Sequence, residues 1–143
     1  MKNKVLEILE NFKEKREIAW ENYRAVCKEE SNAVANILDF TGKYIKINDT
    51  IDNGYIYLKV TKQVQCPYYG TEKPGLTLYG IGFSNPTSDR SVWFLLDSDY
   101  SYSINLTEIS EELDKIQEIT EAEFKYHYFK MQTAAGEKLM EML

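Results

Sequence analysis

Apolar residues recur at steps of three or four near the start of the chain and at every second position in its middle. The first pattern covers residues 3–38, which contain neither Pro nor Gly, and predicts a helical segment over 1–39. A single helix of about 35 residues would extend roughly 52 Å, whereas a compact domain of this length is about 37 Å across. We therefore expect a break near 28–32, where Ser31 or Asn32 could cap a second helix, or an overhang that packs on another subunit.

The alternating pattern begins after Gly42 and predicts five short strands within 42–107. They cover residues 42–47, 55–62, 76–83, 92–96 and 102–106, and they are separated by turns or loops at 52–54, 65–75, 84–89 and 97–99. Gly80 and Gly82 indicate a bulge, a bend or a close approach of another backbone or a ligand. This spacing predicts a bent antiparallel meander or a small SH3-like barrel.

A C-terminal helix over 120–142 has the clearest start signal in the sequence. Thr120 stands at the N-cap, Glu123 completes a capping box, and Ile119 and Phe124 occupy the hydrophobic-staple positions. Gly136 is expected to end or fray this helix.

Just before that helix, residues 115–119 suit a sixth short strand, although 110–113 could equally start a helical turn. The sequence therefore predicts a single α+β domain over 1–143. It consists of an N-terminal helical segment, a five- to six-stranded bent antiparallel sheet or small barrel, and a C-terminal helix.

The composition, 43% apolar and 28% charged, is typical of one soluble globular domain. No apolar run approaches the roughly 18 residues of a membrane span, and acidic residues interrupt the apolar start that a signal peptide needs. We therefore expect a cytoplasmic protein without membrane contact. In a reducing compartment Cys27 and Cys66 are expected to be free thiols.

The net charge of −6 is concentrated near the C-terminus, since residues 108–143 carry 9 acidic and 4 basic side chains. With only three arginines elsewhere, this distribution disfavours sequence-specific DNA binding. Part of the acidity suits the start of a helix. The rest predicts an acidic patch for a basic partner, made by Glu108, Glu111, Glu112 and Asp114.

Motifs of catalysis are sparse. His127 is the only histidine, and no Gly-rich phosphate loop or dinucleotide fingerprint is present. We predict no catalytic residues, no metal and no cofactor. The best local pair of carboxylates, Asp97 and Asp99 around Ser98, leaves open a hydrolase or a cation site.

Eleven tyrosines are the strongest sign of contact chemistry, because a tyrosine ring adds a large apolar face and a polar tip at low entropic cost. Ordinary sheet packing explains many of them. Tyr55 and Tyr57 share one strand face, opposite Ile56, Leu58 and Val60, and are expected to form an outward or second-layer surface. Tyr68 and Tyr69 lie between Pro67 and Gly70, so at least one is expected to reach solvent or a partner unless the loop folds back over the barrel. The predicted ligand- or partner-binding residues are Tyr55, Tyr57, Tyr68, Tyr69 and Arg90.

The segments 42–47, 55–62, 78–84 and 118–124 together resemble small uncharacterised proteins often encoded by phages and mobile elements of Gram-positive and gut bacteria. The resemblance covers roughly residues 41–130. It implies an accessory protein that acts on components of its host, anti-defence inhibitors being one such class. It carries over no functional residue, and the long N-terminal helical segment departs from the shorter form.

These observations favour a non-enzymatic binding protein, phage-type, that binds and inhibits a host protein in the host cytoplasm through tyrosines and the acidic patch. A second hypothesis is the sequestration of a small nucleotide-like ligand in a groove between subunits, where Tyr68, Tyr69 and Arg90 would bind it. A homo-oligomer built through the N-terminal helix would supply such a groove. A third hypothesis is a hydrolase that uses Asp97 and Asp99.

Overall fold

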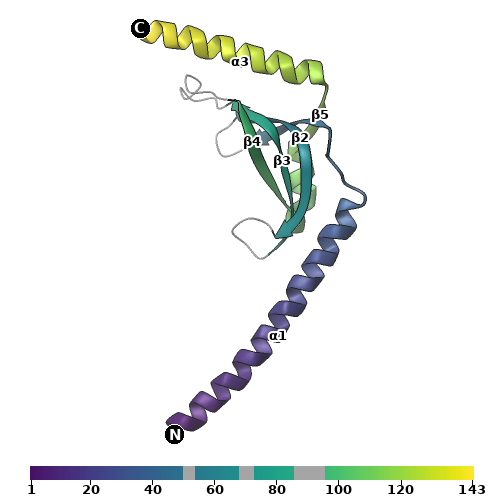
Figure 1. Cartoon of the computed structure of the whole chain (residues 1–143), viewed down its shortest axis with the longest axis vertical. Helices are drawn as coiled ribbons and strands as arrows, with labels where there is room; N and C mark the ends of the chain where they lie inside the picture. The colour runs from purple at the N-terminus through teal and green to yellow at the C-terminus, as the bar shows by residue number, and fades with distance from the viewer. Residues whose placement is uncertain (50–53, 68–72, 86–95) are drawn as a thin grey trace.

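The computed structural model of the chain describes residues 1–49, 54–67, 73–85 and 96–143. Figure 1 shows a small sheet from which one long helix projects, while a second helix crosses at the opposite end. In chain order the elements are α1 (Lys2–Ala35), β1 (Tyr44–Asp49), β2 (Gly54–Pro67), β3 (Pro74–Asn85), β4 (Asp97–Asn105), the 3-10 helix η2 (Leu106–Glu108), α2 (Ile109–Lys115), β5 (Ile116–Ile119) and α3 (Glu121–Met142). The predicted α+β class is confirmed.

The described strands form an open antiparallel sheet in the order β4-β3-β2-β1-β5. Both alternatives before α3 are realised, because α2 forms a helical turn and β5 follows it as a short strand. The strand predicted at 92–96 falls almost entirely outside the described residues.

Two predicted loops are wrong in part. Residues 65–67 and 74–75 of the loop predicted at 65–75 are strand, because Gln65 and Cys66 continue the ladder opposite Leu76 and Gly75, and pairing ends only where Pro67 meets Pro74. Proline has no backbone donor, so it suits the end of a ladder. The turn predicted at 97–99 is the start of β4, which pairs with β3 from Asp97 onward.

The predicted close approach at Gly80 and Gly82 is confirmed. The register shifts at both places, between Val60 and Lys62 and between Gly80 and Gly82. A Cβ atom on Gly80 would lie 1.8 Å from the carbonyl oxygen of Lys59, and one on Gly82 would lie 2.9 Å from the Tyr100 ring. Bulges of this kind bend the strands and increase their twist.

The predicted break in the N-terminal helix is wrong. α1 is a single helix of 34 residues, and its C-terminal turns contact β2 and β3. Cys27, just before the segment 28–32 where the break was expected, and Ser31, within it, are both buried, so packing on the sheet supports the helix there. The N-terminal part continues outward into solvent, as Figure 1 shows.

One face of the sheet carries the larger core. Its fully buried side chains are Ile45, Ile47, Leu58, Val60, Leu76, Leu78 and Ile104. The end of α1, Phe40, η2 and α2 cover this face. Gln63 fastens the segment after α1, since its amide donates to the carbonyl oxygen of Leu38 at 2.8 Å and its Oε1 accepts from the Phe40 N–H at 2.9 Å.

The other face carries a smaller, aromatic core beneath α3. Tyr57, Phe83 and Ile119 pack there against Phe124 and Met131. The predicted cap of α3 is confirmed, because the Glu123 N–H donates to Thr120 Oγ1 at 3.1 Å. Gly136 does not end the helix, which continues to Met142.

Candidate binding surface

Tyr55 and Tyr57 project from the same face of β2, as predicted, but α3 covers only one of them. Tyr57 retains 2% of its surface and Tyr55 retains 39%. The Tyr57 ring stacks on Phe83 at 4.9 Å and on His127 at 4.7 Å between centroids. Tyr57 is therefore a core residue beneath α3 and is not available to a partner, which corrects its place among the predicted contact residues.

A path of ring contacts links this core to solvent at both ends. At one end Tyr57 lies 6.4 Å from the Tyr55 ring, and at the other end His127 lies 5.4 Å from the Tyr126 ring, which is 61% exposed. The Lys46 ammonium lies over the Tyr55 ring, 4.0 Å from its centroid, in a cation–π contact. We call Lys46, Tyr55, Tyr126 and His127 the aromatic surface.

The electrostatics of the aromatic surface are set by lysines and not by its histidine. Burial lowers the pKa of His127 below its usual value, and the charges of Lys46 and Lys130 lower it further, while Glu123 opposes them. Burial also raises the pKa of Tyr57, with a smaller contribution from Tyr55. At neutral pH the imidazole is thus uncharged, and the positive charge here belongs to Lys46 and Lys130.

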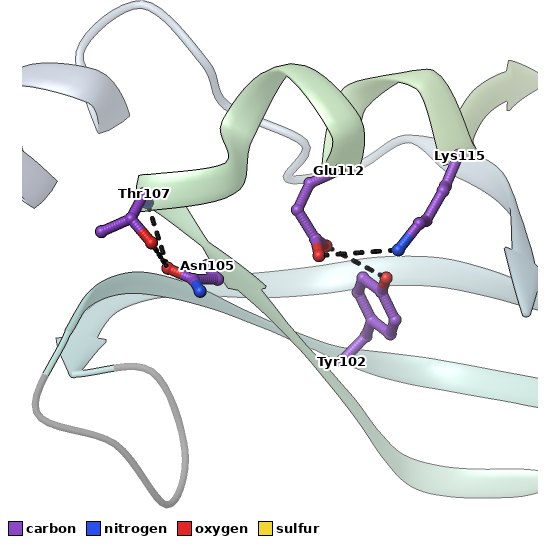
Figure 2. A network of polar contacts seen from close by, with 5 residues as sticks. All are labelled: Tyr102, Asn105, Thr107, Glu112 and Lys115. Carbon is purple, nitrogen blue, oxygen red and sulfur yellow. Dashed lines mark hydrogen bonds and ion pairs between the residues drawn. The ribbon is translucent and has the colours of Figure 1, made fainter. Parts of the chain in front are cut away.

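Three of the four predicted acidic residues are exposed on η2 and α2, namely Glu108, Glu111 and Asp114, and we keep the name acidic patch for these three. Glu112 differs, because it is 7% exposed and turns inward. Its Oε2 accepts from the Tyr102 hydroxyl at 3.2 Å, and its Oε1 lies 3.9 Å from the Lys115 ammonium, as Figure 2 shows. Glu112 therefore fastens α2 to β4 and is not part of the acidic patch.

A second set of contacts in Figure 2 fixes where η2 begins, directly before α2. The buried Asn105 accepts two hydrogen bonds at its Oδ1, from the Thr107 N–H at 3.0 Å and from the Thr107 hydroxyl at 2.8 Å. This is an N-cap of η2. Together with the Glu112 contact it holds the acidic patch in one position against the sheet.

The remaining predicted residues divide into two groups. Tyr68, Tyr69 and Arg90 lie outside the described residues. Asp97 and Asp99 are exposed at the start of β4, where the Asp99 N–H donates to Asp97 Oδ1 at 2.8 Å. Within the described ranges, no three His, Cys, Asp or Glu side chains are grouped closely enough to hold a metal ion.

Sequence reasoning missed Lys46 and Tyr126. Lys46 alternates with Ile45 and Ile47, so the sequence predicts that it lies on the opposite face of the strand. Its position beside Tyr55 depends on the pairing of β1 with β2, which the sequence does not show. Nothing in the local sequence distinguishes Tyr126 from an ordinary exposed helix residue. Its neighbour His127 is half-buried.

No protein-family model matches the chain, and no curated protein or solved structure matches it significantly. Among the described residues, no helix combines the length and apolar character needed to cross a membrane.

Proposed function

We propose that this is a non-enzymatic binding protein that holds a partner protein at the aromatic surface. The observation that carries the proposal is that exposed rings at this surface are already fixed by contacts within the chain. Tyr55 is held between Lys46 and the buried Tyr57, and Tyr126 contacts His127. Rings ordered before binding lose little conformational freedom when a partner arrives, which favours affinity.

The charges around the surface narrow the kind of partner. Lys46 and Lys130 flank the rings, and both act on His127. A partner segment that brings apolar side chains together with carboxylates would fit this combination. The acidic patch of Glu108, Glu111 and Asp114 offers a separate contact for basic side chains of the same partner.

We further propose that the partner is a host protein and that binding inhibits it in the host cytoplasm. This part of the proposal rests on the resemblance of residues 41–130 to accessory proteins of phages and mobile elements. The aromatic surface supports binding, and the resemblance supplies the direction of the effect.

A matched capture experiment tests the proposal. Three tagged proteins are incubated with a lysate of a Gram-positive bacterium: the wild type, the double variant Tyr55→Ala with Tyr126→Ala, and Tyr79→Ala as the control. Tyr79 is suited to this role because it is 40% exposed, about the same as Tyr55 at 39%. The wild type and the control are expected to recover the same protein in stoichiometric amount, and the double variant is expected to lose it. Recovery of no such protein, or equal recovery by all three, contradicts the proposal.

A further inference from the structure

We propose that the projecting part of α1 pairs with α1 of a second copy of this chain, in antiparallel orientation. The chain would thus be a homodimer joined by a two-helix coiled coil, with the two sheets near opposite ends. This inference is independent of partner binding at the aromatic surface.

An apolar stripe runs along the projecting part of α1. At about 100° per residue, the apolar side chains of one group fall within about 50° of a single line along α1. They are Val5, Ile8, Leu9, Phe12, Ala19, Tyr23 and Val26. The large members remain 43–59% exposed. Arg16 is the one charged side chain on this line between Val5 and Val26. Monomers rarely leave an apolar face of this length in water.

The stripe continues into the contact that α1 makes with β2 and β3. Cys27, Ser31 and Val34 bring the last turns of α1 onto the sheet. Beside them Val26 and Glu30 stay exposed, so the sheet does not close off the end of the stripe. The sheet thus covers only part of the stripe, at its C-terminal end. A second helix can therefore lie along the whole length of the stripe.

The distribution of charge along α1 favours the antiparallel orientation. Residues 2–16 carry 5 basic and 3 acidic side chains, a net charge of +2. Residues 17–35 carry 2 basic and 4 acidic side chains, a net charge of −2. An antiparallel pair places each half beside the oppositely charged half of its partner, whereas a parallel pair places like beside like.

Individual layers of side chains also fit an antiparallel pair. Residues 5, 12, 19 and 26 repeat every seven positions, as do residues 9, 16, 23 and 30. With the centre of the pair between residues 17 and 18, Phe12 meets Tyr23 of the second copy and Leu9 meets Val26. Arg16 then meets the small Ala19, which leaves room for its long side chain. A parallel pair would instead place Arg16 against Arg16 and Glu30 against Glu30.

Mass measurement tests the pairing. The wild type is expected to sediment at twice its chain mass of 16.7 kDa. Phe12→Glu, on the stripe, is expected to weaken association at least tenfold. Ile18→Glu is the matched control, because Ile18 is 60% exposed but lies on another side of α1. A monomeric wild type, or equal loss of association in both variants, would overturn the proposal. Circular dichroism establishes that each variant keeps its fold.

Distances between spin labels test the orientation. In a background with Cys27→Ala and Cys66→Ala, single labels are placed at Lys4→Cys or at Lys15→Cys. Antiparallel pairing predicts about 40 Å between the two labels at position 4 and less than about 20 Å at position 15. Short distances at both positions would show a parallel pair, and no dipolar coupling at position 15 would show that α1 does not pair. Either result refutes the antiparallel dimer.

Discussion

Tyr57 of β2 and His127 of α3 stack with their ring centroids 4.7 Å apart and their planes inclined by 27°. This contact joins the C-terminal helix to the sheet and places the aromatic surface at their junction. The Phe83 ring stacks against Tyr57 as well. The position of the exposed rings therefore depends on a buried tyrosine that was itself expected to contact a partner.

Removal of the Tyr57 ring is expected to lower the free energy of unfolding by about 3–5 kcal/mol, as for other large buried aromatic side chains. The reason is the loss of ring contacts on both faces together with the cavity left behind. Urea denaturation of Tyr57→Ala measures the change. Tyr79→Ala, at a half-exposed site, is expected to cost less than about 1.5 kcal/mol. A similar loss in both variants would show that the Tyr57 stack has no special role in stability.

Stability is expected to fall as the pH decreases below about 6.5. Burial, then Lys46 and Lys130, keep the pKa of folded His127 below its ordinary value of 6.5. Above that value the imidazole is neutral in both states, so its contribution is fully present. At lower pH the unfolded chain takes up the proton more readily, and stability is lost until the folded protein is protonated as well.

The pH dependence is measured as the free energy of unfolding of wild type and His127→Phe between pH 7.5 and about pH 5. The variant is expected to lose the decrease that the wild type shows in this window. The pKa values of Asp39 and Glu121 are lowered in the folded protein, so these carboxylates act at more acidic pH and equally in both proteins. Parallel curves for the two proteins would refute the role of His127.

Local signals in the sequence predicted much of the fold, because their physical cause is local. The Thr120 capping box and the alternation around Tyr57 each determine a short piece of backbone without help from distant residues. The continuity of α1 could not be predicted in this way, since it depends on Cys27 and Ser31 packing on β2 and β3. The difference in burial between Tyr55 and Tyr57 depends on where α3 lies. Alternation assigned both rings to one face, and only the packing of α3 separated them.

The N-cap of α3 gives a further prediction. Thr120→Ala removes the oxygen that accepts the Glu123 N–H and is expected to cost about 1 kcal/mol in the free energy of unfolding. Thr133→Ala, at an exposed position inside the same helix, is expected to be neutral or slightly stabilising, because alanine has the higher helix propensity. Thermal unfolding of both variants supplies the measurement. The role of the cap is disproved if Thr120→Ala unfolds no more readily than Thr133→Ala.

Two glycines are expected to respond in opposite directions to substitution by alanine. At Gly80 the added Cβ would collide with the carbonyl oxygen of Lys59, so Gly80→Ala is expected to cost more than about 2 kcal/mol. At Gly136 nothing lies within 4 Å of an added Cβ, and the residue is inside α3. Gly136→Ala is therefore expected to stabilise the protein by about 0.5–1 kcal/mol. Chemical denaturation compares the two, and destabilisation of similar size at both sites would contradict the bulge geometry.

Binding at the aromatic surface is the central claim, and calorimetric titration with the captured partner tests it most directly. The wild type and Tyr79→Ala are predicted to bind one partner per chain with equal affinity. Tyr126→Ala, which removes an exposed ring without disturbing the core, is predicted to bind at least tenfold more weakly, a difference of about 1.4 kcal/mol. Equal affinity of all three proteins for the partner would contradict the account.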